Sequence, residues 1–338
     1  MRGLRRYTGT ELGTGIRVAL LVNDNIGNFV VATPLMQMLR AQHEPIEVWY
    51  FGGSRTREFE EASDLIDERF ELARANADEL FSQIQYEPID WVINLERGAE
   101  FQRLAGLLGE QGALVTGPVI DSQGNPVEFE PGPEGSLWGD MDWVSDTITR
   151  KYPFLQSGFI GEMFCRLCYL EGEVPLYSLP AVSPNRELPD VLISASASLP
   201  DKLWTHENWL ALIKWLGSEG LSVGLLGAPV KAQQAHWKGA DLESRLLQES
   251  NLVDLRGQLT LPEVVGSLSE VKGCVTLDNG IMHVACAAST PTVGLFRHGI
   301  HRLWSPPASY LCAVVAEPGR PVSTVPWDAA RTAWQDLW

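Results

Sequence analysis

One stretch of the chain places polar residues between a buried strand and the start of a helix, an arrangement suited to binding anions. Asp278, Asn279 and Gly280 follow a short apolar run rich in strand formers. They precede a small, apolar, helix-compatible segment that begins with Ile281 and contains His283. The N–H groups of residues 279–283 are then expected at a helix N-terminus, where Gly280 permits close approach. The pattern predicts a phosphate or diphosphate site, although an ordinary βαβ unit without a ligand has the same outline.

The same stretch resembles the C-terminal motif of the family 9 glycosyltransferases, the ADP-heptose:lipopolysaccharide heptosyltransferase family. Members carry Asp, a small polar residue, Gly, an apolar pair and His, then an Ala-rich helix and a Thr-Pro turn, which here is Thr290-Pro291. Four further segments resemble the family in the family's own order: residues 22–40, 90–95, 202–209 and 225–229. Each match is weak alone, and five in order strongly favour the family.

Strand and helix patterns alternate along both halves of the chain, which predicts parallel sheets with helices on both faces. The resemblance implies the GT-B fold, an α/β fold in which two Rossmann-like α/β/α domains face each other across a cleft. The expected organisation is a flexible N-terminal tail (1–15), an acceptor-binding domain (16–172), a Pro-rich linker (173–189), a nucleotide-sugar-binding domain (190–325) and a C-terminal helix (326–338). In this fold such a helix usually crosses back to the first domain.

Composition narrows the class of protein. The chain has 338 residues and a net charge of −17, which argues against a nucleic-acid partner. No apolar run is long enough for a transmembrane segment, and the basic start lacks the apolar core of a secretory signal. Five cysteines do not make a disulfide framework, so we expect a cytoplasmic protein, for which peripheral membrane contact stays open.

The resemblance implies a nucleotide site in the C-terminal half. It places Lys202 near the diphosphate, where a cation offsets charge on the leaving group, whereas on its own Lys202 reads as a solvated surface lysine. His283 either faces phosphate or is a packed helix histidine. No metal or separate cofactor is expected, and the co-substrate is a nucleotide-diphosphate sugar, with an ADP-sugar favoured. The expected nucleotide-binding residues are Ser196, Ser198, Lys202, Gly227, Asp278, Asn279, Gly280, Ile281 and His283.

The expected general base departs from the family. Members carry Ile/Met-Gly-Asp in the first βα loop, whereas this chain has Ile26-Gly27-Asn28, and an amide cannot accept a proton. Asp24 on the same loop is our first replacement and Glu96, after another strand, the second. Asn28 then orients the acceptor. The remaining alternative is a chain that binds the nucleotide sugar without efficient transfer.

Three other patterns carry less weight. The family's ribose-contacting acid is replaced by Val230-Lys231, which leaves the nucleobase and the sugar open. Asp140 and Asp142 spell the D-x-D of metal-dependent glycosyltransferases but follow a Gly/Pro-rich loop rather than a strand, so we interpret them as chance. A C-x-x-C pair at 165 and 168 is interpreted as two packed helix residues.

The sequence therefore predicts a metal-independent glycosyltransferase that moves a heptose or related sugar to a hydroxyl acceptor, either a glycan or a small molecule. Residues 1–160 have a net charge of −12, so we expect a neutral or cationic acceptor rather than lipid A core. Arg55 and Arg57 are the main exceptions and could bind one anionic group. The alternatives are a non-catalytic sugar-nucleotide-binding protein and a GT-B-shaped sugar-nucleotide epimerase.

Overall fold

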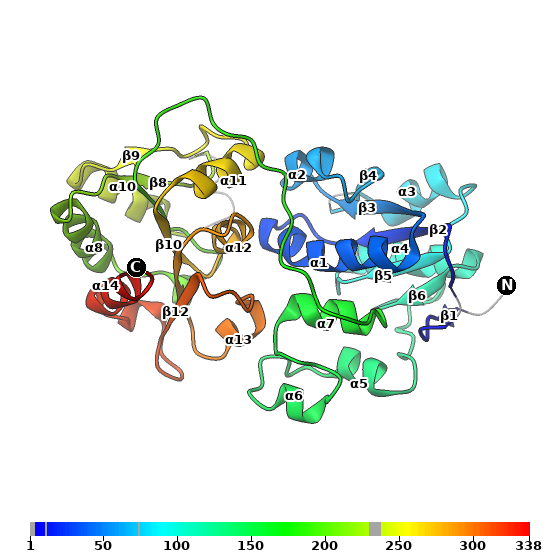
Figure 1. Ribbon diagram of the computed structural model, residues 1–338. Helices are drawn as coiled ribbons and strands as arrows, with labels where there is room; N and C mark the ends of the chain where they lie inside the picture. Colours follow the sequence, from blue (N-terminus) through cyan, green and yellow to red (C-terminus); the bar gives the residue numbers. More distant parts are fainter. Residues whose placement is uncertain (1–3, 11, 74, 230–237) are drawn as a thin grey trace. The chain divides into compact units, whose positions relative to one another are not determined.

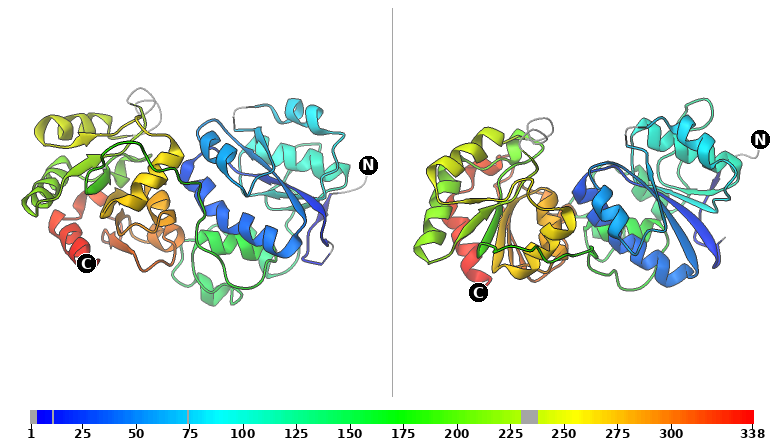
Figure 2. Two further views of the ribbon diagram at one scale, coloured as in Figure 1. Left: turned by 45° about the horizontal axis from the view of Figure 1, so that its top comes forward. Right: turned by 90° about the horizontal axis from the view of Figure 1, so that it is seen from above.

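The structure, a computed structural model, describes residues 4–10, 12–73, 75–229 and 238–338. The chain divides into two compact units, residues 1–178 and 179–338. Each unit is a six-stranded sheet with helices on both faces (Figures 1 and 2). The prediction of two parallel α/β sheets is confirmed. Among the described residues, no helix has both the length and the apolarity that a bilayer crossing requires.

The sheet of the first unit has the strand order β1-β6-β5-β2-β3-β4, and every neighbouring pair is parallel. The chain goes from β2 outward to β3 and β4, then returns past β2 to β5 and β6. Consequently β2 and β5 are neighbours whose following loops leave in opposite directions. The strands are β1 (Arg5–Arg6), β2 (Ile16–Leu21), β3 (Ile46–Gly52), β4 (Glu68–Glu71), β5 (Trp91–Asn94) and β6 (Leu114–Thr116).

Side chains alternate between the two faces of this sheet. Leu21 and Phe51 point to the face that α3 and α4 cover. Tyr50 points to the other face, where its ring lies 5.4 Å from that of Phe29 on α1. Both faces are therefore buried, as a parallel sheet requires. The helices are α1 (Ile26–His43), α2 (Arg57–Ala62), α3 (Ala77–Ile84), α4 (Ala99–Gln111), α5 (Pro133–Gly139), α6 (Ile148–Lys151) and α7 (Ile160–Leu167).

Helix α1 begins at Ile26, so Asn28 lies on its first turn. Pro34 inside the helix has no N–H to donate to the carbonyl of Val30. The Thr33 hydroxyl donates to that carbonyl instead, at 2.8 Å. This local replacement explains how α1 continues through the proline.

The N-terminal segment is part of the first sheet and not a tail. Arg5 and Arg6 pair with β6, and the Arg6 side chain donates hydrogen bonds to three backbone carbonyls, those of residues 117, 127 and 128. Tyr7 is buried with its ring 4.3 Å from that of Trp91. For residues 4–10 the expectation of a flexible tail is therefore wrong, because β1 pairs with β6 and forms the edge of the sheet.

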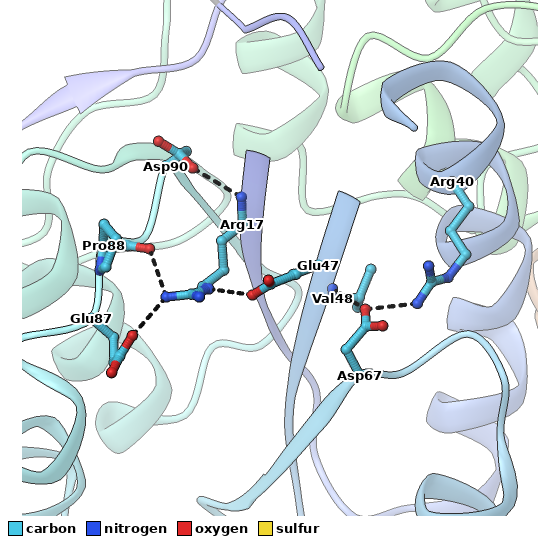
Figure 3. Close-up of polar contacts among 8 residues, drawn as sticks. All are labelled: Arg17, Arg40, Glu47, Val48, Asp67, Glu87, Pro88 and Asp90. Carbon is cyan, nitrogen blue, oxygen red and sulfur yellow. Dashed lines mark hydrogen bonds and ion pairs between the residues drawn. The ribbon is translucent and has the colours of Figure 1, made fainter. Parts of the chain in front are cut away.

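Ion pairs gather at the amino ends of the first unit's strands (Figure 3). Arg17, near the start of β2, pairs with Glu47 at 2.6 Å and with Glu87 at 2.9 Å. Arg40 on α1 pairs with Asp67 at 2.7 Å. Part of the negative charge of this half is thus neutralised locally, at the amino ends of the strands and away from their carboxyl ends.

The second unit repeats this arrangement in five of its six strands, with the strand order β12-β11-β10-β7-β8-β9 and parallel pairing throughout. Here β7 and β10 are the neighbours whose following loops leave in opposite directions. β4, β9 and β12 are edge strands of the two sheets. The strands are β7 (Val191–Ser194), β8 (Val223–Leu225), β9 (Val253–Asp254), β10 (Gly273–Leu277), β11 (Thr292–Phe296) and β12 (Leu311–Val315).

The helices α8, α10 and α14 supply the core on one face of this sheet, and α12 packs on β10 and β11. Trp334 of α14 is buried in that core, and α14 packs on α8, β11 and β12. These contacts lie within the second unit. The helices are α8 (His206–Ser218), α10 (Ala240–Glu249), α11 (Leu261–Glu270), α12 (Gly280–Ala287), α13 (Ile300–Trp304) and α14 (Trp327–Asp336), with 3-10 turns η1 (Pro200–Lys202) and η2 (Val322–Thr324).

Candidate functional site

In each unit the predicted residues, except Gly227 after β8, follow the two neighbouring strands at which the chain reverses its direction of winding. In the second unit, the loop after β7 carries Ser196, Ser198 and Lys202, and the loop after β10 carries Asp278 and Asn279. In the first unit the candidates follow β2 and β5. Ligands of open α/β sheets bind at such positions, outside the carboxyl ends of the strands.

Asn279 connects the two loops of the second unit. As the N-cap of α12, its Oδ1 accepts hydrogen bonds from the N–H groups of Ile281 at 2.9 Å and Met282 at 3.3 Å. Its Nδ2 donates to the Ser194 hydroxyl at 3.0 Å and to the Ser196 carbonyl at 2.9 Å. Two of the N–H groups predicted to face an anion are therefore capped internally, and for them that prediction is wrong.

Lys202 and Asp278 form an ion pair at the same edge. Their Nζ and Oδ2 atoms are 2.8 Å apart, and Nζ also donates to the Asp278 carbonyl at 3.3 Å. The exposed fractions of the two side chains are 16% and 5%. Lys202 is thus not a solvated surface lysine. The structure places it beside the Asp278 loop, which the sequence analysis had assigned to the same nucleotide site.

His283 lies on the first turn of α12 and is buried. Burial lowers its pKa to about 4, an effect that the nearby Lys202 increases and Asp278 opposes. Its ring lies 5.7 Å from that of Trp304, at an interplanar angle of 71°. A neutral, packed imidazole fits the second of the two interpretations of this residue.

The remaining predicted nucleotide-site residues differ in exposure. Ser196 is buried, whereas Ser198 is exposed. Gly227 follows β8, and its carbonyl accepts a hydrogen bond from the N–H of Gly257 at 2.9 Å. Val230 and Lys231, which replace the family's ribose-contacting acid, lie outside the described residues.

Glu96 and Asn28 meet in the first unit. Glu96 Oε1 accepts a hydrogen bond from the Asn28 side-chain amide at 3.2 Å and another from the N–H of Asn23 at 3.1 Å. Burial raises the pKa of Glu96, and these hydrogen bonds only partly oppose the rise. A partly buried carboxyl group with a raised pKa has the properties of a general base.

Asp24 has a different environment. Its carboxylate pairs with Arg55 at 2.7 Å, and Arg55 also donates to the Asn25 side chain at 2.6 Å. Gly53 lies against it, since a Cβ there would come within 2.5 Å of the Asp24 Cβ. The Asp24 carboxylate is already held by the Arg55 guanidinium, whereas Glu96 accepts hydrogen bonds from neutral groups, so the geometry reverses our order and favours Glu96.

Two other sequence patterns are structural. Asp140 pairs with Lys151 at 2.6 Å, and no group of residues that could hold a metal ion occurs in the described parts of the chain. Cys165 and Cys168 are buried free thiols, and burial raises the pKa of both, to about 12 for Cys165. A thiol that stays protonated is a poor nucleophile and metal ligand.

Sequence reasoning missed two features of the site. The first is the Asn279 side chain, which connects two loops. The sequence offered one local indication of it, because Asn directly before a helix is a favoured N-cap. The pairing of Arg297 with Asp201, at 2.8 Å, joins loops 96 residues apart and had no local signal.

The sequence of the second unit is similar to that of known glycosyltransferases. Residues 178–319 match the family model for glycosyltransferase family 9 (heptosyltransferase). The chain is 32% identical over 116 residues to lipopolysaccharide heptosyltransferase 2 of Salmonella typhimurium, a match covering 34% of this chain and 32% of that protein. The aligned stretch thus spans about a third of the relative's length.

Solved structures resemble the chain over nearly its full length. The ADP-heptose lipopolysaccharide heptosyltransferase II of E. coli has a TM-score of 0.67 at 18% identity, covering 95% of this chain and 98% of that one. An E. coli heptosyltransferase determined with ADP has a TM-score of 0.64 at 16% identity, covering 96% and 100%. At these identities the likeness establishes the fold, which is that of GT-B heptosyltransferases.

Proposed function

Since residues 178–319 are those of a family 9 (heptosyltransferase) glycosyltransferase, we propose that this chain transfers a sugar from a nucleoside-diphosphate donor to a hydroxyl acceptor. The observation that carries the proposal is the pairing of Lys202 with Asp278 beside the Asn279-capped helix. All three residues lie inside the matched region and at the ligand-binding edge of the sheet.

The second unit binds the nucleotide sugar in this proposal. Lys202 offsets the negative charge that develops on the leaving diphosphate, and no metal is needed for that role. The N-terminus of α12 adds a favourable dipole. Asn279 holds both loops in place before the ligand arrives, so little reorganisation is needed during the reaction. An ADP-sugar is our first choice because a structural neighbour of this chain was determined with ADP.

The first unit binds and activates the acceptor. Glu96 removes the proton from the acceptor hydroxyl, and the resulting oxygen nucleophile forms a bond to the anomeric carbon. The bond between that carbon and the diphosphate oxygen breaks, and the nucleoside diphosphate leaves with the electron pair. Asn28 holds the Glu96 carboxylate through its amide and orients it toward the acceptor.

The acceptor itself we propose to be neutral or cationic. Arg55, one of the two arginines that could have bound an anion, pairs at 2.7 Å with Asp24, whose side chain is only 10% exposed. Arg57 pairs with Glu71 at 2.7 Å in a more exposed position. Net charge alone is a weaker argument, because Glu47 and Glu87 pair with Arg17 at the far edge of the sheet. Turnover should therefore be higher on an uncharged acceptor than on a phosphorylated core oligosaccharide, and the reverse preference would contradict this assignment.

The nucleotide site can be tested without knowing the acceptor. Thermal unfolding is followed with ADP, UDP, GDP, dTDP and NAD at equal concentration. A nucleoside diphosphate present at 100 times its dissociation constant adds about 2.7 kcal/mol to the free energy of unfolding. We expect one diphosphate to stabilise selectively, ADP first. If none stabilises the chain, the proposed nucleotide site is wrong.

A sugar-nucleotide-binding protein without transfer is the second candidate, favoured by the amide at position 28. In that case the nucleotide panel gives the same result, but no acceptor supports release of nucleoside diphosphate. An epimerase is separated by product analysis, since it alters the sugar of the nucleotide substrate in the absence of any acceptor.

A further inference from the structure

A short basic segment borders the proposed nucleotide site. Residues 297–302, Arg-His-Gly-Ile-His-Arg, hold four basic side chains and no acidic one. Arg297 follows β11, which pairs with β10, so the segment begins beside the Asp278 loop at the carboxyl edge of the sheet. The Trp304 ring that contacts His283 belongs to the helix that this segment opens. The helix that the basic segment opens therefore packs against the first turn of α12 through the ring contact between Trp304 and His283.

Arg297 is held by one carboxylate. Its Nη1 atom donates to Asp201 Oδ2 at 2.8 Å. Asp201 directly precedes Lys202 in η1, and Lys202 pairs in turn with Asp278. Two ion pairs thus join the loops that follow β7, β10 and β11, and each of the two cations faces an acid at this edge.

The pair between Arg297 and Asp201 can be exchanged for another anion. The exposed fraction of the Asp201 side chain is 47%, and so exposed a pair contributes little to stability. The Arg297 side chain is 24% exposed, and its Nε is buried without a hydrogen-bond partner among the described residues. A guanidinium group has five N–H donors in a planar fork suited to phosphate, so Arg297 has capacity left for a ligand.

We propose that Arg297 is a second cation for the diphosphate of the nucleotide substrate, and that it exchanges Asp201 for a phosphate oxygen when the nucleotide binds. Asp201 holds the guanidinium in place in the free protein and competes with the ligand for it. The inference rests on the proposed function and adds a residue that distinguishes a nucleoside diphosphate from a monophosphate, because Lys202 alone provides one point charge.

The test measures dissociation constants by isothermal titration calorimetry on the full chain. The probes are the nucleoside diphosphate that stabilises the chain most and the matching monophosphate. Arg297→Gln should weaken diphosphate binding about tenfold to a hundredfold, the usual range for a lost charge-assisted hydrogen bond. It should leave monophosphate binding unchanged. Asp201→Asn should strengthen diphosphate binding, because it removes the competing carboxylate. Arg297→Lys, which keeps the charge, should retain part of the affinity.

The Arg297→Gln and Asp201→Asn variants should change the affinity for the diphosphate in opposite directions, which distinguishes a ligand-binding role of Arg297 from a structural one. If the ion pair were purely structural, replacing either partner would change the affinity in the same direction. Lys272→Gln is the matched control, because Lys272 pairs with Asp190 at 2.9 Å at the opposite edge of the same sheet. It removes the same charge and should leave affinity unchanged.

Three results would overturn the inference: no effect of Arg297→Gln on diphosphate binding, equal weakening of both probes, or weaker binding in Asp201→Asn. If Lys202→Gln weakens binding while Arg297→Gln does not, the inference alone fails. If the unmodified chain binds none of the diphosphates, the proposed function fails with it.

Discussion

The proposal of Glu96 rather than Asp24 as the general base rests on the environments of these two residues in the first unit. Glu96→Gln should lower kcat by about 10²–10⁴, the usual effect of losing a general base. Asp24→Asn should have a smaller effect, since Asp24 is already paired with Arg55. Initial rates with saturating nucleotide sugar measure both, and Glu47→Gln, at the far edge of the sheet, serves as the control. A larger loss in Asp24→Asn would restore Asp24 as the base.

The pH profile gives a second check on Glu96. Burial raises the pKa of Glu96, and transfer requires its carboxylate form. We therefore expect kcat/KM to fall as the pH decreases, and to do so at a pH above the pKa of an ordinary glutamate, which is about 4.3. Asn28→Asp replaces a hydrogen-bond donor with a like charge, so the acid limb should move to higher pH. Increased turnover of this variant across the whole pH range would instead indicate a lost base at position 28.

His283 makes stability depend on pH. Its pKa is about 4 in the folded protein and about 6.5 when unfolded, so between these values only the unfolded chain binds the proton. This contribution is fully present above pH 6.5 and is lost as pH falls toward 4, by at most about 1.4 kcal/mol per pH unit. Between pH 7 and pH 5, the free energy of unfolding of His283→Asn should decrease by about 2 kcal/mol less than that of the unmodified chain, as measured by urea unfolding. His298→Asn, which changes an exposed histidine, should follow the unmodified chain.

At the scale of elements, the start of α12 depends on one side chain. Asn279→Ala removes the cap and both donations to the β7 loop, so we expect a loss of about 1–2 kcal/mol in the free energy of unfolding, together with weaker nucleotide binding. Asn279→Asp keeps the acceptor for Ile281 but loses the donor to Ser194. It should recover much of the stability and little of the affinity. Equal recovery of both would show that the connection to the β7 loop is unimportant.

The sequence predicted the elements of the site better than their contacts. The capping box of α11, formed by Thr260 and Glu263, lies within four residues, and Thr followed three residues later by Glu before an apolar run indicates it from the sequence alone. The hydrogen bond between Asn28 and Glu96 spans 68 residues and depends on β5 being placed beside β2. Neighbouring strands that are not consecutive leave no periodic signal in the chain, so such contacts follow only from the complete sheet.

At the scale of the whole molecule, the two units have separate proposed substrates. Nucleoside diphosphate alone should slow amide hydrogen exchange at residues 194–202 and 278–283 of the second unit. Residues 23–28 and 94–97 of the first unit should stay unchanged until an acceptor is added. Exchange monitored by mass spectrometry distinguishes these segments. Equal protection of both units by the nucleotide alone would contradict this division.

The strand orders have a consequence for how such a chain can change. Strands β2–β6 of the first unit and β7–β11 of the second are arranged alike. The sixth place is filled by β1, which precedes the other strands of its unit in the chain, and by β12, which follows them. Each sheet is completed by a strand of its own unit, and no strand pairing in the described residues crosses the boundary at residue 178. Recombination there would exchange whole halves intact. New combinations of sugar and acceptor could then arise by shuffling, without rebuilding either hydrophobic core.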